Sequence, residues 1–249
     1  MLHNPVFRPL LWPTMFTLAA LPVLLGLGFW QLDRLEWKEA LLAKIERRME
    51  AGPAPLPTPE AWGEINPHAE EYTRFLLEGR FLTREFHYFQ QNAQGTPGYA
   101  VISPLEVAEG AVVLVNRGFV PAQLKEMDAH GGVPEGADGT PLHFIGILRA
   151  PATRGTFDGV DDPEKNIWMV RDPAAMGATL DVPHVAPFII DAEPGSFPGE
   201  YPKAGATRPD LPNNHLDYAL TWFSLAAILL IIYVLYHRAN GRIGRPAAK

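Results

Sequence analysis

The stretch from Leu216 to Tyr236, with the sequence LDYALTWFSLAAILLIIYVLY, decides the fold of this chain. Its ionisable groups are Asp217 and the tyrosines, so the rest of the stretch carries no charge. A helix rises ~1.5 Å per residue, and 21 residues therefore cover the ~30 Å of hydrocarbon in a bilayer. The sequence predicts a transmembrane helix over residues 216–236.

A second uncharged stretch, residues 10–32, lies near the start of the chain. It contains Pro13 and Pro22, which membrane helices tolerate where local rearrangement satisfies the freed backbone carbonyls. A cleaved signal peptide is the alternative, because Arg8 precedes the apolar run. The run is long for a signal peptide, however, and no Ala-x-Ala site follows it. We therefore expect a retained transmembrane helix over residues 10–32.

The flanks of the two stretches indicate the topology. The head, residues 1–9, carries Arg8, and the tail, residues 237–249, carries three arginines and a lysine, while neither flank carries an acid. Basic residues are enriched on the cytoplasmic side of membrane proteins, so both termini are expected in the cytoplasm. The intervening domain, residues 33–215, is then expected on the outer side of the membrane.

Charge and composition limit what this domain binds. All but five of the 21 basic residues and all but one of the 28 acidic residues lie between residues 33 and 215. Such an acidic segment repels a phosphate backbone, which argues against nucleic acid as a partner. The chain has no cysteine, which excludes disulfides, iron-sulfur clusters and zinc-thiolate sites. Packing must hold the outer domain together.

The outer domain is predicted to be rich in β-strands. Short runs of β-branched and aromatic residues alternate with turn-forming residues such as those at 94–98 and 131–132. The seven expected strands are residues 74–81, 86–92, 99–105, 111–120, 142–148, 166–170 and 185–190. A short helix is expected at residues 173–179. The predicted fold class is an α+β membrane protein in which two transmembrane helices flank one β-rich domain, open-barrel or sandwich-like, of undetermined strand order.

Less regular segments join this domain to the two spans. Residues 36–49 are rich in helix formers, so the first membrane helix is expected to continue outward as an amphipathic helix. Five glycines and prolines between Gly52 and Pro59 then predict an extended connector rather than a packed element. Residues 194–212 are again rich in proline and glycine, and are expected to form a return connector.

The residues of the outer domain do not indicate an enzyme. The three serines lie outside any Gly-x-Ser-x-Gly or Ser-x-x-Lys motif, and no nucleotide-binding or zinc-protease motif occurs. The scattered histidines are expected to be surface or loop residues rather than metal ligands: His68, His87, His130, His143 and His184. The acids between Asp158 and Glu164 depart from the EF-hand spacing, which favours a solvated loop over a calcium site.

The start of the second span carries a candidate ligand, His215. At 100° per residue, one helix face holds an imidazole above aromatic and small residues, and the opposite face holds a row of polar residues. The first face consists of His215, Tyr218, Ala219, Trp222, Ala226, Leu229 and Tyr233; the second consists of Asp217, Thr221, Ser224 and Ile228. The first face suits a flat macrocycle such as haem. The second suits hydrogen bonding to a neighbouring helix.

A simpler interpretation of the same residues is an interfacial aromatic belt, with His215 as an ordinary residue at the helix start. The first span places Trp30, Gln31 and Arg34 in the same leaflet. Arg34 would pair either with Asp217 or with an anionic group such as a haem propionate. The residues by themselves leave these alternatives open.

Four blocks of sequence resemble the Surfeit locus protein 1 family, the assembly factors of haem-copper oxidases, in its alphaproteobacterial form. They span both apolar stretches and the domain between them. The blocks are Gly28-Phe29-Trp30-Gln31-Leu32 with Arg34-Leu35 and Trp37-Lys38; Pro97-Gly98-Tyr99 leading to Pro104-Leu105; Val115-Asn116-Arg117-Gly118-Phe119-Val120-Pro121; and Asn213-Asn214-His215-Leu216 with Tyr218-Ala219 and Thr221-Trp222-Phe223. One departure lies beside His215, where Asp217 stands at a position at which an amide is common in the family.

The resemblance implies a non-enzymatic protein of the bacterial inner membrane with a periplasmic central domain. It implies that the protein binds haem a transiently and aids its insertion into subunit I of a haem-copper oxidase, with haem a synthase as a further partner. His215 is the implied ligand of the haem iron, with Tyr218, Trp222 and Trp30 packing the ring and Arg34 pairing with a propionate. The alternative is a cofactor-free scaffold that stabilises an oxidase assembly intermediate. The identity of the oxidase, a second haem ligand and the oligomeric state are left open.

Two glycine-containing sites are also expected to shape the domain. Asn116-Arg117-Gly118 at the end of a predicted strand suggests a tight turn anchored by Arg117. Gly79 within the strand at 74–81 suggests a bulge or a close approach of another backbone.

Overall fold

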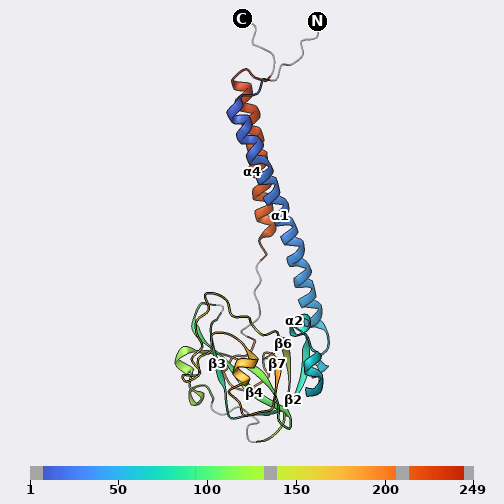
Figure 1. Ribbon diagram of the computed structural model, residues 1–249, viewed down its shortest axis with the longest axis vertical. Helices are drawn as coiled ribbons and strands as arrows, with labels where there is room; N and C mark the ends of the chain where they lie inside the picture. Colours follow the sequence, from blue (N-terminus) through green and yellow to red (C-terminus); the bar gives the residue numbers. More distant parts are fainter. Residues whose placement is uncertain (1–7, 93, 132–138, 206–212, 244–249) are drawn as a thin grey trace. The chain divides into compact units, whose positions relative to one another are not determined.

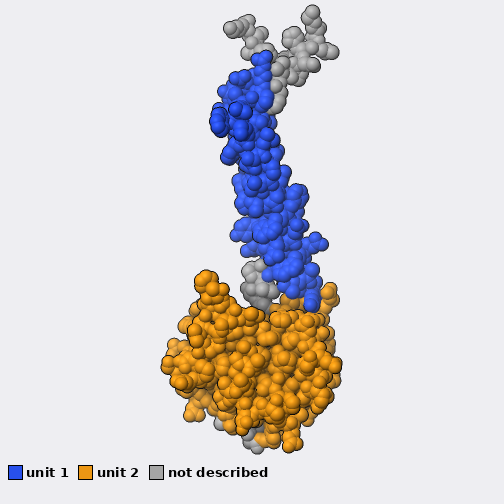
Figure 2. Space-filling model, in the orientation of Figure 1, with its two compact units in different colours: residues 1–44, 210–249 blue, residues 45–209 orange. Residues whose placement is uncertain are grey.

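A computed structural model of the chain describes residues 8–92, 94–131, 139–205 and 213–243. The chain divides into two compact units, residues 1–44 with 210–249 and residues 45–209 (Figure 2). Two helices dominate the first unit and strands dominate the second (Figure 1). The predicted return connector, residues 194–212, lies in part outside the described residues.

Two long helices form the first unit: α1 (Leu11–Glu50), which continues into the second unit, and α4 (His215–Ala239). The predicted span 10–32 and the helical segment 36–49 belong to the single helix α1, as expected. Only 17% of the most apolar stretch of α1 and 11% of that of α4 are buried. An apolar helix of a soluble protein is buried in a core, whereas these helices expose their apolar side chains as lipid contact requires. They are candidate membrane spans, and they suggest a membrane location.

α1 and α4 run antiparallel, and hydrogen bonds between the start of α1 and the end of α4 join them. Thr14 Oγ1 lies 2.9 Å from the Tyr233 hydroxyl. The backbone N–H of Leu10 donates to Nε2 of His237 at 3.0 Å, and Nδ1 of His237 donates to the carbonyl of Tyr233 at 2.8 Å. A buried histidine of α4 thus satisfies a backbone donor at the start of α1.

The two faces predicted on α4 differ in burial. The face with the small residues packs within the helix pair, where Ala219 and Ala226 are buried. Small side chains allow helix backbones to approach closely, so these alanines serve helix packing and are closed to a macrocycle. The polar row of Asp217, Thr221 and Ser224 is exposed, so it does not serve the contact with α1.

Five strands close into a barrel in the second unit. In hydrogen-bonded order they are β2 (Arg74–Phe81), β6 (Leu142–Arg149), β7 (His184–Ala192), β5 (Ala111–Pro121) and β4 (Pro97–Ala108). Antiparallel pairing of β2 with β4 closes the ring, and β5 with β7 is its parallel pair. Two further strands, β1 (Ala54–Pro55) and β3 (Phe86–Gln91), extend the sheet beside β2 and β4. The predicted class, two apolar helices flanking a β-rich domain, is confirmed, and the domain is a closed barrel.

Hydrophobic clusters lie on both faces of β5. Val113 and Val115 belong to the cluster inside the barrel, whereas Val112 and Leu114 belong to a cluster outside it. Successive side chains of a strand point to opposite faces, so an unbroken apolar run is what a strand buried on both faces requires. The short helix α3 (Pro173–Gly177) covers the outer cluster through Met176.

Six of the seven predicted strands are present, and the one at residues 166–170 is not. Isolated bridges pair Trp168 with Tyr88 and Ile167 with Asp162. Asn166 has a φ of 52°, which an extended strand does not allow. The hydrophobic residues that suggested a strand are instead used for packing, because Trp168 meets Phe86 edge-on at 5.6 Å.

The proline-rich segment at residues 52–59 contains the short strand β1, and none of its residues is buried, as expected of an extended connector. The packing begins directly after it, where the 3-10 helix η1 (Pro59–Glu64) inserts Trp62 into the cluster inside the barrel. The indole N–H of Trp62 donates to the carbonyl of Pro57 at 2.9 Å. The segment after β7 also packs in its described part, since Phe197 lies 5.1 Å from Phe144 between ring centroids. The remaining short elements are α2 (Pro67–Glu70), η2 (Ala122–Leu124) and η3 (Met127–Ala129).

Asn116-Arg117-Gly118 lies within β5, so the predicted turn is wrong. Gly118 pairs with Val101 and Asn116 pairs with Ile102, which makes Arg117 the extra residue of a β-bulge. Gly118 has a φ of 135°, and a Cβ there would lie 2.2 Å from the backbone of Lys203. At Gly79, a Cβ would lie 2.4 Å from the carbonyl oxygen of Glu106, which confirms the predicted close approach.

Candidate functional site

His215 is the first residue of α4, and a side chain of α1 holds its imidazole. Nδ1 of His215 lies 2.7 Å from Oε1 of Gln31. An amide oxygen only accepts hydrogen bonds, so Nδ1 carries the hydrogen and donates it. The neutral ring then offers the lone pair of Nε2. A metal-ligating histidine has this arrangement, with one nitrogen fixed by a hydrogen bond and the other available to the metal.

Gly28 allows Gln31 to be held at this position. The two residues are three apart on one face of α1, and both are buried. A Cβ on Gly28 would lie 2.6 Å from the ring of Phe223, so the glycine lets this ring rest against the backbone of α1. Phe223 also meets Phe29 edge-on, with 5.3 Å between ring centroids. Close packing one turn away therefore fixes the position of Gln31.

The aromatic residues predicted for the site differ in exposure. Tyr218 is 56% exposed and Trp30 is 52% exposed, so both offer open ring surface near His215 along the helices. Trp222 is half-buried. Exposed aromatic rings at the end of two apolar helices are available to a flat ligand. Of the predicted ring-packing residues, Tyr218 and Trp30 remain open for such a contact.

Arg34 and Asp217 do not pair in the described part of the chain. The guanidinium of Arg34 instead lies over the indole of Trp37, 4.6 Å from the ring centroid. The Gln31–His215 contact explains this, because Arg34 is three residues beyond Gln31 on α1 while α4 begins at His215. Asp217 is one turn into α4 and exposed, and its carbonyl accepts from Thr221 Oγ1 at 2.8 Å.

The residue that the sequence analysis placed near the site without giving it a role is Gln31. A polar, uncharged side chain within an otherwise apolar stretch, one turn after a glycine, was the available signal. To recognise His215 as the partner of Gln31, one must know which residues of α1 lie beside which residues of α4. The spacing of residues within a single helix does not determine this register.

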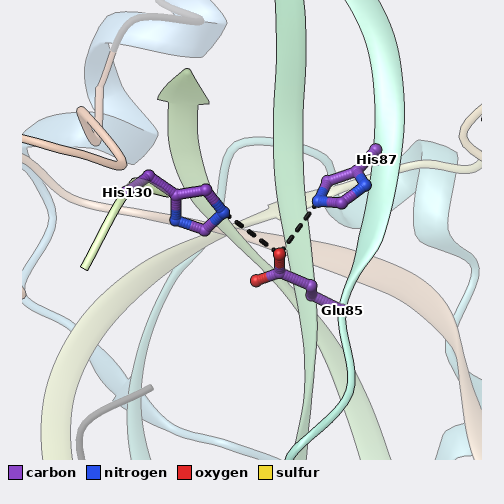
Figure 3. A group of neighbouring side chains, drawn as sticks. All are labelled: Glu85, His87 and His130. Atoms are coloured by element: carbon purple, nitrogen blue, oxygen red, sulfur yellow. Dashed lines mark hydrogen bonds and ion pairs between the residues drawn. The ribbon is translucent and has the colours of Figure 1, made fainter. Parts of the chain in front are cut away.

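A second polar cluster lies in the barrel unit and consists of Glu85, His87 and His130 (Figure 3). Glu85 Oε1 lies 2.9 Å from His87 Nε2 and 3.1 Å from His130 Nε2. The expectation of surface or loop histidines is wrong here, since His87 is on β3 and only 4% exposed, and His130, directly after η3, is only 3% exposed. The Glu85 carboxylate, which accepts from both rings, makes their burial possible.

Neighbouring side chains stabilise the ionised form of Glu85. Burial raises its pKa, but the hydrogen bonds from His130 and His87 outweigh this effect and lower the pKa to about 2. Nη1 of Arg117, the bulge residue, lies 3.9 Å from Glu85 Oε2. Burial lowers the pKa of Arg117, and the charge of Glu85 opposes that shift. The cluster therefore contains a buried carboxylate and a buried guanidinium.

The acidic run after Gly155 forms a loop, as expected. Arg154 pairs with Asp161, and Lys165 pairs with Asp162 at 2.8 Å. Asp161 also accepts from the backbone N–H of Met169 at 2.7 Å. The Asp161 and Asp162 carboxylates are thus engaged by basic groups and, for Asp161, by the backbone.

Fold and site together define a class of protein: a β-barrel domain between two candidate membrane helices, with a histidine at the start of the second helix hydrogen-bonded to the first. A sequence model of the SURF1 family matches residues 18–227. The chain therefore belongs to the SURF1 family. The match includes both apolar helices in part and the whole barrel.

Individual relatives agree with this assignment. The chain is 34% identical to the SURF1-like protein of Monosiga brevicollis over 242 residues, which cover 91% of this chain and 88% of that protein. It is 33% identical to Surfeit locus protein 1 of Homo sapiens over 218 residues, covering 81% of this chain and 70% of that protein. A bacterial relative, the SURF1-like protein of Rickettsia felis, is 28% identical over 231 residues, covering 89% and 95%.

Proposed function

We propose that this protein is an assembly factor of a haem-copper terminal oxidase that binds haem a transiently and aids its insertion into subunit I. Membership of the SURF1 family supports the assembly role. The observation that carries the haem proposal is the hydrogen bond from His215 Nδ1 to Gln31 Oε1, which leaves Nε2 as an oriented ligand. The protein makes and breaks no covalent bond in this role.

The residues at the end of the helix pair fit a bound haem in part. His215 would ligate the iron, while Tyr218 and Trp30 would pack against the macrocycle through their exposed rings. Arg34 is exposed and would pair with a propionate. Trp222 would contribute an edge only, because it is half-buried. His215 is the one iron ligand that this chain would supply, and a single protein ligand would suit a carrier that must release its cargo.

The proposal includes a location. We place the protein in the bacterial inner membrane, with both termini in the cytoplasm and the barrel in the periplasm, since the basic residues near the ends favour that orientation. Haem a would then be handed over at the outer edge of the membrane. Haem a synthase as donor and subunit I as acceptor are the partners this route requires.

Purification after co-expression with haem a synthesis enzymes tests the haem proposal. The full-length protein in detergent should carry haem a, identified by its pyridine haemochrome spectrum, and His215→Ala should lose most of it. His143→Ala is the matched control, because His143 is an exposed histidine of the barrel. Equal haem absorbance in wild type and His215→Ala would sink the proposal.

A cofactor-free scaffold is the second candidate function, and the exposed polar row on α4 favours it. Asp217, Thr221 and Ser224 face away from α1, where polar side chains would suit hydrogen bonds to a helix of another protein. Colourless protein that still co-purifies subunit I, with this binding lost on replacing the three residues by leucine, would support the scaffold. Coloured protein that depends on His215 would support haem transfer.

A further inference from the structure

The cluster of Glu85, His87 and His130 in the barrel unit has the donor atoms of a metal site, and it is separate from the residues proposed for haem. We propose that Glu85, His87 and His130 bind a divalent transition-metal cation of the zinc and copper kind. One carboxylate and two imidazoles are the donors of many zinc sites with an open position and of the 2-His-1-carboxylate iron sites. The chain contains no cysteine, so soft thiolate ligation is absent and nitrogen and oxygen donors define the site.

The spacing of the three ligand atoms suits such a cation. The chosen carboxylate oxygen and imidazole nitrogens all lie within 4.8 Å of one another. Glu85 Oε1 is 2.9 Å from one nitrogen and 3.1 Å from the other. In a tetrahedral site with bonds of ~2.0–2.2 Å, neighbouring ligand atoms are roughly 3.3–3.6 Å apart. Both rings already point toward the carboxylate (Figure 3), so the cation would enter with small displacements of the side chains.

A pocket beside the cluster supplies an entry path. It encloses about 340 Å³, and its lining includes Glu85 and His87. Further lining residues are Glu126, Met127, Asn166 and Trp168. Three protein ligands with a neighbouring pocket leave one position for water, as in zinc sites that exchange ligands.

The second oxygen of the Glu85 carboxylate is also available to a cation. Within the described part of the chain, Glu85 Oε2 is buried without a hydrogen-bond partner, and Nη1 of Arg117 lies 3.9 Å from it. Buried polar atoms are nearly always paired, so this oxygen needs an explanation. A cation with its bound water would engage the free carboxylate oxygen directly or through that water.

Two neighbouring side chains, Arg117 and Asn166, limit the affinity for the cation, so that the bound cation would exchange. Arg117, 3.9 Å from Glu85 Oε2, opposes additional positive charge. The amide nitrogen of Asn166 lies 3.2 Å from His87 Nδ1 and 2.9 Å from the carbonyl oxygen of Glu85. Ligation through His87 Nε2 moves the ring hydrogen to Nδ1, and the Asn166 amide must then turn to accept it. Binding therefore replaces existing hydrogen bonds, which favours reversible loading over permanent retention.

Titration of the full-length, tag-free protein with Co²⁺ tests the proposal. The visible d–d absorbance of the bound Co²⁺ should saturate at one equivalent, and Zn²⁺ should displace the signal. Glu85→Gln and His130→Gln should each weaken binding by about tenfold or more. His143→Gln is the matched control and should bind as wild type, since His143 is exposed and lies 3.9 Å from the exposed Glu78. Absent binding, or equal binding in all four proteins, overturns the site.

A measurement on the unaltered protein covers the case in which the barrel variants fail to fold. Pulsed electron paramagnetic resonance of one equivalent of Cu²⁺ should detect two imidazole nitrogens, and detection of none or one overturns the site. His215→Ala in this experiment should keep both couplings. The barrel variants should keep haem a, so failure of the cation site and failure of the haem site are distinguishable.

Discussion

A single hydrogen-bond acceptor fixes the tautomer and the orientation of the His215 imidazole. A histidine at the start of a helix is common, and exposed to water it samples both tautomers. Here the oxygen of Gln31 selects the tautomer with hydrogen on Nδ1 and orients the ring. The oxygen comes from the other helix, so the orientation of the imidazole and its free Nε2 depends on the pairing of α1 with α4.

Removal of this acceptor should weaken haem binding without removing the ligand. In Gln31→Leu the ring loses its orientation, and we expect the affinity for haem a to fall by about 10–100-fold, the usual effect of losing such a partner. Gln31→Glu keeps an acceptor and should bind close to wild type. Haem titration followed by absorbance measures both. A wild-type affinity in Gln31→Leu would show that the hydrogen bond has no part in binding.

Gly118 is the residue at which the barrel should be least tolerant of a methyl group. Gly118→Ala combines a φ of 135° with a Cβ placed 2.2 Å from the Lys203 backbone, and it should lower the free energy of unfolding by about 3 kcal/mol. Gly52→Ala is the control, because a Cβ there meets nothing within 4 Å. Thermal unfolding of the full-length protein compares them. Equal melting temperatures would contradict the account of the bulge.

The sequence allowed His215 to be predicted, but not its partner or the cluster around Glu85. His215 was recognisable because it borders a long apolar run and lies within a family motif. His87 and His130 are 43 positions apart, and a β-strand and a 3-10 turn bring them to one carboxylate. Contacts of that kind depend on tertiary folding, which local patterns do not encode.

Among the elements, the contact between α1 and α4 depends on the small residue Gly28. Gly28→Leu should separate the helices, because even a Cβ would lie 2.6 Å from the Phe223 ring. Thr14→Cys with Tyr233→Cys provides the readout, since these side chains touch at 2.9 Å and the chain has no other cysteine. A short bis-maleimide should cross-link this pair several-fold less in Gly28→Leu. Gly26→Leu, at a position with nothing within 4 Å, should cross-link as wild type.

The 3-10 helix η1 should contribute strongly to the stability of the barrel. Trp62→Ala leaves a cavity in the cluster inside the barrel and should cost about 3–5 kcal/mol of unfolding free energy. Leu76→Ala on β2 is a suitable control, because Leu76 is exposed and its loss should change stability by less than about 1 kcal/mol. Denaturant unfolding of the full-length protein, followed by circular dichroism, compares the two changes. Similar effects of the two changes would mean that η1 packs only loosely.

Strand positions were predictable and strand order was not. Runs of β-branched and aromatic residues located β2, β3, β4, β5, β6 and β7 to within a few residues. The closing contact of β2 with β4 consists of two residue pairs, Arg80 with Glu106 and Phe81 with Leu105. No local pattern marks so short a pairing. The burial of Trp62 was missed for a related reason, since this residue packs against strands distant in sequence.

At the scale of the whole molecule, the proposed function requires the barrel and the two ends of the chain to lie on opposite sides of the membrane. α1 and α4 are antiparallel and each is long enough to cross. Hydrogen bonds join them both near residues 10–14 and at Gln31, so the pair can span a bilayer as one unit. Two crossings place both chain ends on one side, and the basic flanks favour the cytoplasm for that side.

Single cysteines introduced into this cysteine-free chain test that topology in a bacterial host. Phe157→Cys lies in the barrel unit at a fully exposed position, and Arg242→Cys lies just after α4 at an exposed one. A membrane-impermeant maleimide should label Phe157→Cys in intact spheroplasts and Arg242→Cys only after lysis, because the bilayer blocks the reagent from the cytoplasm. The reverse pattern would place His215 at the cytoplasmic edge, and labelling of both before lysis would mean that the two helices do not both span.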